Sequence, residues 1–163
     1  MKVEDLFLTP MRQRHIYELR SWRYEGEYAF YNLPIASEPP EHPDEFAKGC
    51  CLAALDESGR LAGHLHFGAD ARIPTEENYD YSPDYLDVGL GLRPDLCGRG
   101  LGGDFMRLGL DYARAQLGAR RFRLSVAAFN QRAIKAYQRC GFKPVAQVTN
   151  AHFKNQFIIM TLD

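Results

Sequence analysis

A glycine-rich turn between a strand-like and a helix-like segment constrains the fold of this chain more than any other feature. The apolar residues 86–92 predict a strand, residues 93–103 contain four glycines, and residues 104–117 have helical spacing. Glycines let a backbone approach a ligand closely, and the first N–H groups of a helix are unpaired and lie at the positive end of its dipole. The pattern therefore predicts a binding site for a phosphate or pyrophosphate.

One ligand class that fits this turn is a dinucleotide. The order Gly98-x-Gly100-x-x-Gly103 matches the dinucleotide fingerprint and would make the chain an NAD(P)-binding oxidoreductase. A dinucleotide fold has this turn after its first strand, and an acidic residue about 20 positions later binds the ribose. Here the turn lies past the middle of the chain. The end of the next predicted strand has no acidic residue, because residues 127–130 read Ala-Ala-Phe-Asn. The oxidoreductase is therefore the remote alternative.

Two motifs favour a different cofactor. Residues 97–102 read Cys-Gly-Arg-Gly-Leu-Gly, and residues 130–142 carry Asn-x-x-Ala-x-x-x-Tyr-x-x-x-Gly-Phe. In this order and at this separation they resemble the GNAT superfamily of N-acetyltransferases, whose cofactor motif is Arg/Gln-x-x-Gly-x-Gly/Ala. The resemblance is sharp over residues 87–144, and Cys97 departs from it where the family has Arg or Gln. It implies acetyl-CoA as cosubstrate and no metal.

The resemblance also implies a fold. We expect an α/β structure, a GNAT-like mixed and mostly antiparallel sheet that is flanked by helices and splayed between strands 4 and 5. The residue pattern agrees, because strand-like and helix-like segments alternate along the chain. Strands are expected at 3–8, 50–55, 61–67, 86–92, 121–128, 142–147 and 151–162, and helices at 12–22, 104–117 and 131–139. Gly118 is expected to end the second helix in the left-handed region.

Length and composition restrict the class of protein. A chain of 163 residues buries one core, so residues 1–163 are expected to form a single GNAT-like acetyltransferase domain. No apolar run approaches the roughly 18 residues of a spanning helix, and the N-terminus lacks signal-peptide features, so we expect a cytoplasmic protein without a membrane partner. A net charge of −1 gives no reason to expect nucleic acid. The four cysteines include no C-x-x-C and predict neither zinc nor disulfides.

The resemblance assigns cofactor contacts to particular residues. The backbone of the strand before the turn would pair with the pantetheine arm and donate an N–H to the thioester oxygen, whereas the turn would bind the pyrophosphate. The implied contacts are Leu90, Gly91 and Leu92 in the strand, Gly98, Arg99, Gly100, Gly102 and Gly103 in the turn, and Asn130 and Tyr137 beyond it. Asn130 would also cap the following helix.

Acetyl transfer by direct attack needs an acid for the leaving thiolate and a base for the amine. Tyr137 is expected to be the acid, because a phenol with a pKa near 10 is protonated at pH 7. Asp87 is the expected base, with Asp84 and Glu77 as reserves. His64 and His66 alternate along a predicted strand without an evident partner.

The sequence says least about the acceptor, the substrate that would receive the acetyl group. Six aromatic residues between positions 17 and 31 could line its pocket, and the acidic residues 70–87 could attract a cationic amine. Packing against the sheet or in a dimer explains the aromatic residues equally well, and a solvated loop explains the acidic residues. We expect a primary amine, either a small molecule or a protein N-terminus, and a monomer or homodimer. The alternative of another class is a catalytically idle acyl-CoA-binding sensor or scaffold.

Overall fold

The computed structural model describes residues 1–163 as one seven-stranded sheet in the order β1-β2-β3-β4-β5-β7-β6. The strands are β1 (Phe7–Pro10), β2 (Cys51–Leu55), β3 (Leu61–Phe67), β4 (Leu86–Leu92), β5 (Phe122–Ala127), β6 (Lys143–Thr149) and β7 (Gln156–Leu162). The helices are α1 (Gln13–Leu19), α2 (Leu101–Leu117) and α3 (Gln131–Arg139), with 3₁₀ turns η1 (Val3–Asp5), η2 (Gly26–Tyr31), η3 (Gly68–Ala71) and η4 (Pro94–Leu96). All strand pairs are antiparallel except β4–β5, which is parallel.

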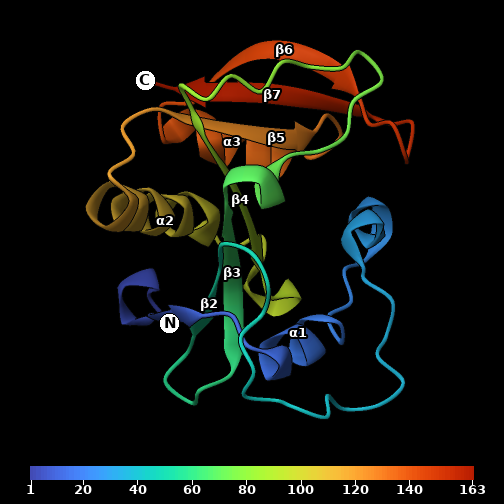
Figure 1. Cartoon of the computed structure of the whole chain (residues 1–163), viewed down its shortest axis with the longest axis vertical. Helices are drawn as coiled ribbons and strands as arrows, with labels where there is room; N and C mark the ends of the chain where they lie inside the picture. The colour runs from blue at the N-terminus through green and yellow to red at the C-terminus, as the bar shows by residue number, and fades with distance from the viewer.

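The sheet is forked between β4 and β5. These strands pair only at Leu86–Phe122 and Asp87–Arg123, whereas β4 stays paired with β3 up to Leu92. Figure 1 shows β3 and β4 lying vertically through the middle of the molecule, with β5, β7 and β6 lying across its top. The expected mixed, mostly antiparallel and splayed sheet is confirmed.

The two faces of β3 serve different purposes. Leu65 points to α2, where a Cβ added to Gly109 would lie 2.8 Å from its side chain, and it joins Phe105 and Leu110 in the main core. His64 alternates to the other face and lies near Trp22, with 6.0 Å between the ring centroids. One face of β3 therefore builds the core, and the other presents imidazoles.

Most predicted elements are confirmed, and the N-terminal strand is the main error. The predicted strand at 3–8 is a 3₁₀ turn followed by β1, because pairing of Phe7–Pro10 with β2 decides which residues extend. Helix α2 begins at Leu101, ahead of the expected 104, because its first glycines lie against Ala136 of α3. Gly118 ends it with φ +66° as expected. No helix is both long and apolar enough to cross a bilayer.

Candidate active site

A cavity of about 450 Å³ lies in the fork between β4 and β5. Its walls come from β3, β4, β5 and β7, the glycine turn, α3 and the segment between Leu19 and Leu33. Most lining side chains are apolar, no carboxylate lines it, and its only charged lining residues are Arg132 and Arg139. Because both charges are positive and the walls have low polarity, the cavity favours an anionic ligand with an apolar or neutral portion.

The glycine turn forms one end of this cavity. Gly100 is the N-cap of α2 with φ +77°, in the left-handed region, and no side chain caps the helix. The backbone N–H groups from Gly98 to Gly103 donate no hydrogen bond within the protein. Arg132 adds positive charge here, because its Nη1 would lie 3.8 Å from a Cβ on Gly98. Free N–H donors and a guanidinium thus converge where the sequence predicts an anion site.

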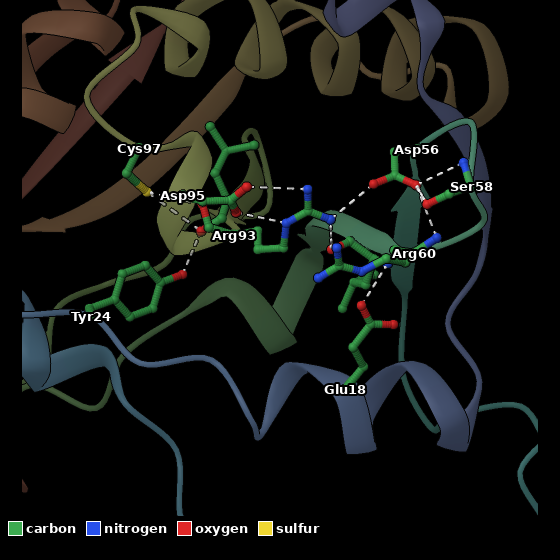
Figure 2. Close-up of polar contacts among 10 residues, drawn as sticks. Glu18, Tyr24, Asp56, Ser58, Arg60, Arg93, Asp95 and Cys97 are labelled. Carbon is green, nitrogen blue, oxygen red and sulfur yellow. Dashed lines mark hydrogen bonds and ion pairs between the residues drawn. The ribbon is translucent and has the colours of Figure 1, made fainter. Parts of the chain in front are cut away.

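A hydrogen-bonded junction holds the end of β4 and the start of the turn (Figure 2). The carbonyl of Leu92 accepts the Tyr24 hydroxyl at 2.7 Å and the Cys97 thiol at 3.5 Å. Arg93 pairs with Asp95 at 2.7 Å and with Asp56 at 3.0 Å. Burial raises the pKa of the Cys97 thiol, so this departure from the family motif is a neutral group that braces the turn.

Most of the predicted cofactor contacts line the cavity. The predicted residues found there are Leu90, Gly91, Leu92, Gly98, Gly100, Gly102, Asn130 and Tyr137. Arg99 is exposed and does not line it, and Gly103 is buried against α3. The structure therefore brings the strand, the turn and the second motif together around one space.

Tyr137 and Asn130 lie on and before α3, beside the fork. Tyr137 is buried and lines the cavity, and its hydroxyl makes no hydrogen bond within the protein. Burial, and to a smaller extent Tyr31, raises its pKa, so the phenol is protonated at neutral pH. Asn130 caps α3 by accepting the N–H of Ala133 at 3.1 Å, and its Nδ2 donates to the Tyr31 hydroxyl at 3.1 Å. The predicted cap is confirmed.

Asp87 does not line the cavity, and its contacts give no support to the expectation that it is the base. Its side chain is buried, with Oδ1 accepting Arg123 Nε at 2.6 Å. Oδ2 accepts Arg123 Nη2 at 2.7 Å and Arg72 Nε at 2.8 Å. Both oxygens are thus taken by guanidinium groups, and this ion pair joins β4 to β5 at the closed base of the fork.

The other acidic residues of the connection 70–87 also lie away from the cavity. Glu77 accepts the N–H of Thr149 at 2.9 Å, Glu76 pairs with Lys154 at 2.5 Å, and Asp84 is exposed. The reserve bases and the negative wall therefore find no support. The expectation that aromatic residues line the pocket has more support, because four of the six line the cavity: Trp22, Tyr24, Tyr28 and Tyr31.

His64 and His66 are the site residues that the sequence argument left without a role. Both line the cavity, and His64 Nδ1 lies 2.7 Å from His66 Nε2. His66 Nδ1 is in turn 3.0 Å from Cys51 Sγ. Burial lowers the pKa of His64 to about 3, so its ring is neutral. Their i, i+2 spacing on a strand was a visible signal that both rings share a face.

Two of the three buried polar side-chain atoms without a hydrogen-bond partner belong to cavity residues. They are Trp22 Nε1 and Ser125 Oγ. Native proteins leave few such groups unpaired, and those that remain call for an explanation. Together with the free N–H groups of the turn, they indicate that the cavity is built for a ligand with polar atoms.

Comparison with known proteins agrees with this geometry. The acetyltransferase (GNAT) family model matches residues 14–142. A curated mycothiol acetyltransferase of Propionibacterium freudenreichii subsp. shermanii is 31% identical over 103 residues, which are 63% of this chain. This chain spans only 30% of the length of that relative.

Solved structures share the fold. A GNAT-family acetyltransferase from Bacillus anthracis matches with a TM-score of 0.67 at 11% identity, over 99% of this chain and 96% of that chain. A mutant spermidine N-acetyltransferase from Vibrio cholerae matches with 0.65 at 18% identity, over 98% and 94%. A putative acetyltransferase from Salmonella typhimurium, solved with acetyl-CoA, matches with 0.53 at 22% identity, over 69% and 63%.

Proposed function

The chain belongs to the acetyltransferase (GNAT) family, and from this premise we propose that it is an acetyl-CoA-dependent N-acetyltransferase. The domain of residues 1–163 would transfer an acetyl group to a primary amine by direct attack. The observation that carries the proposal is the cavity in the fork, with the free N–H groups of the turn at its mouth and the Tyr137 hydroxyl within it.

The chain offers a binding surface that suits the pantetheine arm and the pyrophosphate of the cosubstrate. Because β4 and β5 part after Asp87, the edge of β4 that faces β5 has no backbone partner beyond that residue. Leu90, Gly91 and Leu92 can therefore pair with the amides of a pantetheine arm as a further strand would. The N–H groups of Gly98–Gly103, together with Arg132, would hold the pyrophosphate. Acetyl-CoA supplies the activated acetyl group as a thioester.

Tyr137 is the proposed acid. A phenol held neutral by burial, with no internal hydrogen bond, can donate its proton to a thiolate formed nearby. Asn130 contributes indirectly, since its cap starts α3 and thereby sets the position of Tyr137. A binding module would not need a free hydroxyl in this cavity, so Tyr137 supports an enzyme over an idle sensor.

The cavity walls also bear on the acceptor. No carboxylate lines them, so an amine with several positive charges would find no opposite charge. Trp22, Leu19 and Leu33 supply apolar and aromatic surface instead. We therefore favour a small primary amine or an N-terminus with an apolar remainder over a polyamine, although a structural neighbour is a spermidine N-acetyltransferase.

Release of free thiol from acetyl-CoA with a panel of amines tests the reaction. We expect turnover with apolar primary amines and weak turnover with spermidine. Tyr137→Phe should lower turnover by about 100-fold and leave coenzyme A affinity within about twofold. Tyr112→Phe, which removes a hydroxyl from a tyrosine stacked on Phe67 outside the cavity, is the matched control. Tight coenzyme A binding without turnover on any amine would establish the idle sensor instead.

Two glycines of α2 test the anion site. Gly100 and Gly118 cap opposite ends of this helix, both have positive φ, and a Cβ on either meets nothing within 4 Å. Alanine at either position should cost about 1 kcal/mol of backbone strain. Only Gly100→Ala should weaken coenzyme A binding, by about tenfold or more, as measured by calorimetry. Equal affinity in the two variants would refute the placement of the pyrophosphate.

A further inference from the structure

We propose that His64 is the general base that takes the proton of the attacking amine, and that His66 positions it and receives the proton from it. The inference rests on the N-acetyltransferase function proposed above. It supplies the base that Asp87 does not provide.

The register of the sheet sets His64 beside the expected reaction centre. His64 lies directly opposite Gly91 across the β3–β4 ladder, and His66 lies opposite Gly89. A Cβ added to Gly91 would overlap the His64 ring at Nε2. The imidazole thus lies against the backbone of β4, at one of the residues that are proposed to hold the thioester arm. This accounts for a glycine within a regularly paired strand.

The hydrogen bonds from His64 through His66 to Cys51 allow one tautomer in which His64 Nε2 can accept a proton. If His64 Nδ1–H donates to His66 Nε2 and His66 Nδ1–H donates to Cys51 Sγ, then His64 Nε2 carries a free lone pair. That nitrogen is the atom beside Gly91. The proposal requires this tautomer, because the opposite direction would leave Nε2 protonated.

The surroundings favour movement of a proton outward from His64. Trp22 packs beside His64, and no carboxylate lines the cavity, so a charge on this ring finds no counter-ion. His66 lies nearer to the carboxylate of Asp70 on η3, which offsets part of the effect of burial on the pKa of His66. From β2, Cys51 faces His66 as a neutral thiol, because burial raises its pKa to about 11. The positive charge is therefore better held at His66.

The proton balance of the step follows from these positions. The amine nitrogen forms a bond to the acetyl carbon, the C–S bond breaks, and its electron pair goes to sulfur. The proton of the amine passes to His64 Nε2, while the Nδ1 proton of His64 passes to His66 Nε2. Tyr137 protonates the sulfur. After the product leaves, the proton returns from His66 Nε2 to His64 Nδ1, His64 Nε2 releases its proton to solvent, and Tyr137 regains one, which restores the starting tautomer.

Removal and rescue of the imidazole test the proposal. His64→Ala should lower turnover by about 100-fold, with coenzyme A affinity within about twofold. Added imidazole should restore turnover in proportion to its concentration, after subtraction of the rate without amine. His152→Ala, which removes an exposed loop histidine, is the control and should behave as wild type. At least half of wild-type turnover in His64→Ala, or a loss without imidazole rescue, would overturn the assignment.

Two conservative variants separate catalysis from packing. His64→Asn keeps a polar group near the Nδ1 position and removes Nε2, so it should be as slow as His64→Ala. His66→Gln keeps a hydrogen-bond acceptor for His64 but cannot take a proton. It should lower maximal turnover and shift the acid limb of the pH profile to lower pH. An unchanged pH profile would remove His66 from the proposal.

A spectroscopic measurement on the wild-type protein does not depend on activity or on the folding of variants. Nitrogen-15 NMR of the histidine rings should find His64 as the neutral Nδ1–H tautomer between pH 5 and 7. Observation of the Nε2–H tautomer would overturn the proposal. If wild type turns over no amine, the proposed function itself fails, whereas wild-type turnover that survives in His64→Ala refutes only the base.

Discussion

Two polar clusters on neighbouring strands contrast sharply in how their atoms are used. In the Asp87 cluster, formed by Asp87, Arg72 and Arg123, both carboxylate oxygens accept guanidinium N–H groups. In the histidine pair, formed by His64 and His66, one ring nitrogen of His64 has no partner within the protein and lies at the cavity. The carboxylate of Asp87 therefore has no free contact to offer the cavity, whereas the proposed tautomer of His64 has a free lone pair beside it.

The position of each cluster in the fork explains the contrast. Asp87 and Arg123 form the last paired position of β4 and β5, so their ion pair closes the base of the fork. The histidines lie further along, where β4 has left β5 and the cavity has opened. The first cluster stabilises the opening, and the second faces into it.

The largest expected effect comes from breaking the Asp87 cluster. Asp87→Asn leaves the buried Arg123 without a counter-ion and should lower the free energy of unfolding by about 3 kcal/mol. Denaturant unfolding measures this loss. Coenzyme A affinity of the folded fraction should stay within about twofold, because Asp87 does not line the cavity. A stability loss below about 1 kcal/mol would remove the structural role we assign to this cluster.

The histidine pair should dominate the response to mild acid. The pKa of His64 is about 3 in the folded protein and about 6.5 in an unfolded chain. Between these values the unfolded chain binds a proton that the folded chain does not, so stability is full above about pH 6.5 and falls as the pH decreases. From pH 6 to pH 4 the loss due to His64 should be about 2 kcal/mol.

His64→Asn isolates this contribution. Urea unfolding of wild type and variant at pH 6, 5 and 4 should give a shallower decline for the variant. Parallel declines would mean that His64 already carries its proton in the folded state, which contradicts a neutral base.

The smallest effects concern the glycines beneath the histidine pair. Gly91→Ala places a Cβ against the His64 ring and should cost about 1–2 kcal/mol of stability, together with a loss of turnover. Gly89→Ala is the matched control for stability, because its Cβ would meet Ala71 at an ordinary 3.6 Å. Thermal unfolding compares the two directly. Equal costs would show that the His64 ring moves away freely.

The glycine turn and the motif from Asn130 to Tyr137 were predictable because their residues are close together in the chain. The turn, Asn130 and Tyr137 stand at spacings set by one strand, two helices and their caps, and the structure gathers them around one cavity. The cap by Asn130 and the left-handed Gly118 follow from local backbone chemistry. Local rules also explain why β4 and α3 lie at the expected residues.

The main departures from expectation arose where pairing between distant segments decides. The start of β1 depends on its partner β2. The contacts of the Asp87 side chain depend on Arg72 and Arg123, which are distant in the sequence. His64 had no evident partner because His66, Gly91 and Trp22 meet it only in the folded sheet.

By itself, the sequence determined that this chain has a glycine-rich turn between a strand and a helix, with glycines where the backbone takes positive φ. It did so because those requirements act within a few residues. Only the tertiary structure decided which titratable groups meet the cavity, since the register of β3 on β4 sets residue 64 against residue 91, and the β4–β5 pair buries Asp87 beneath the fork.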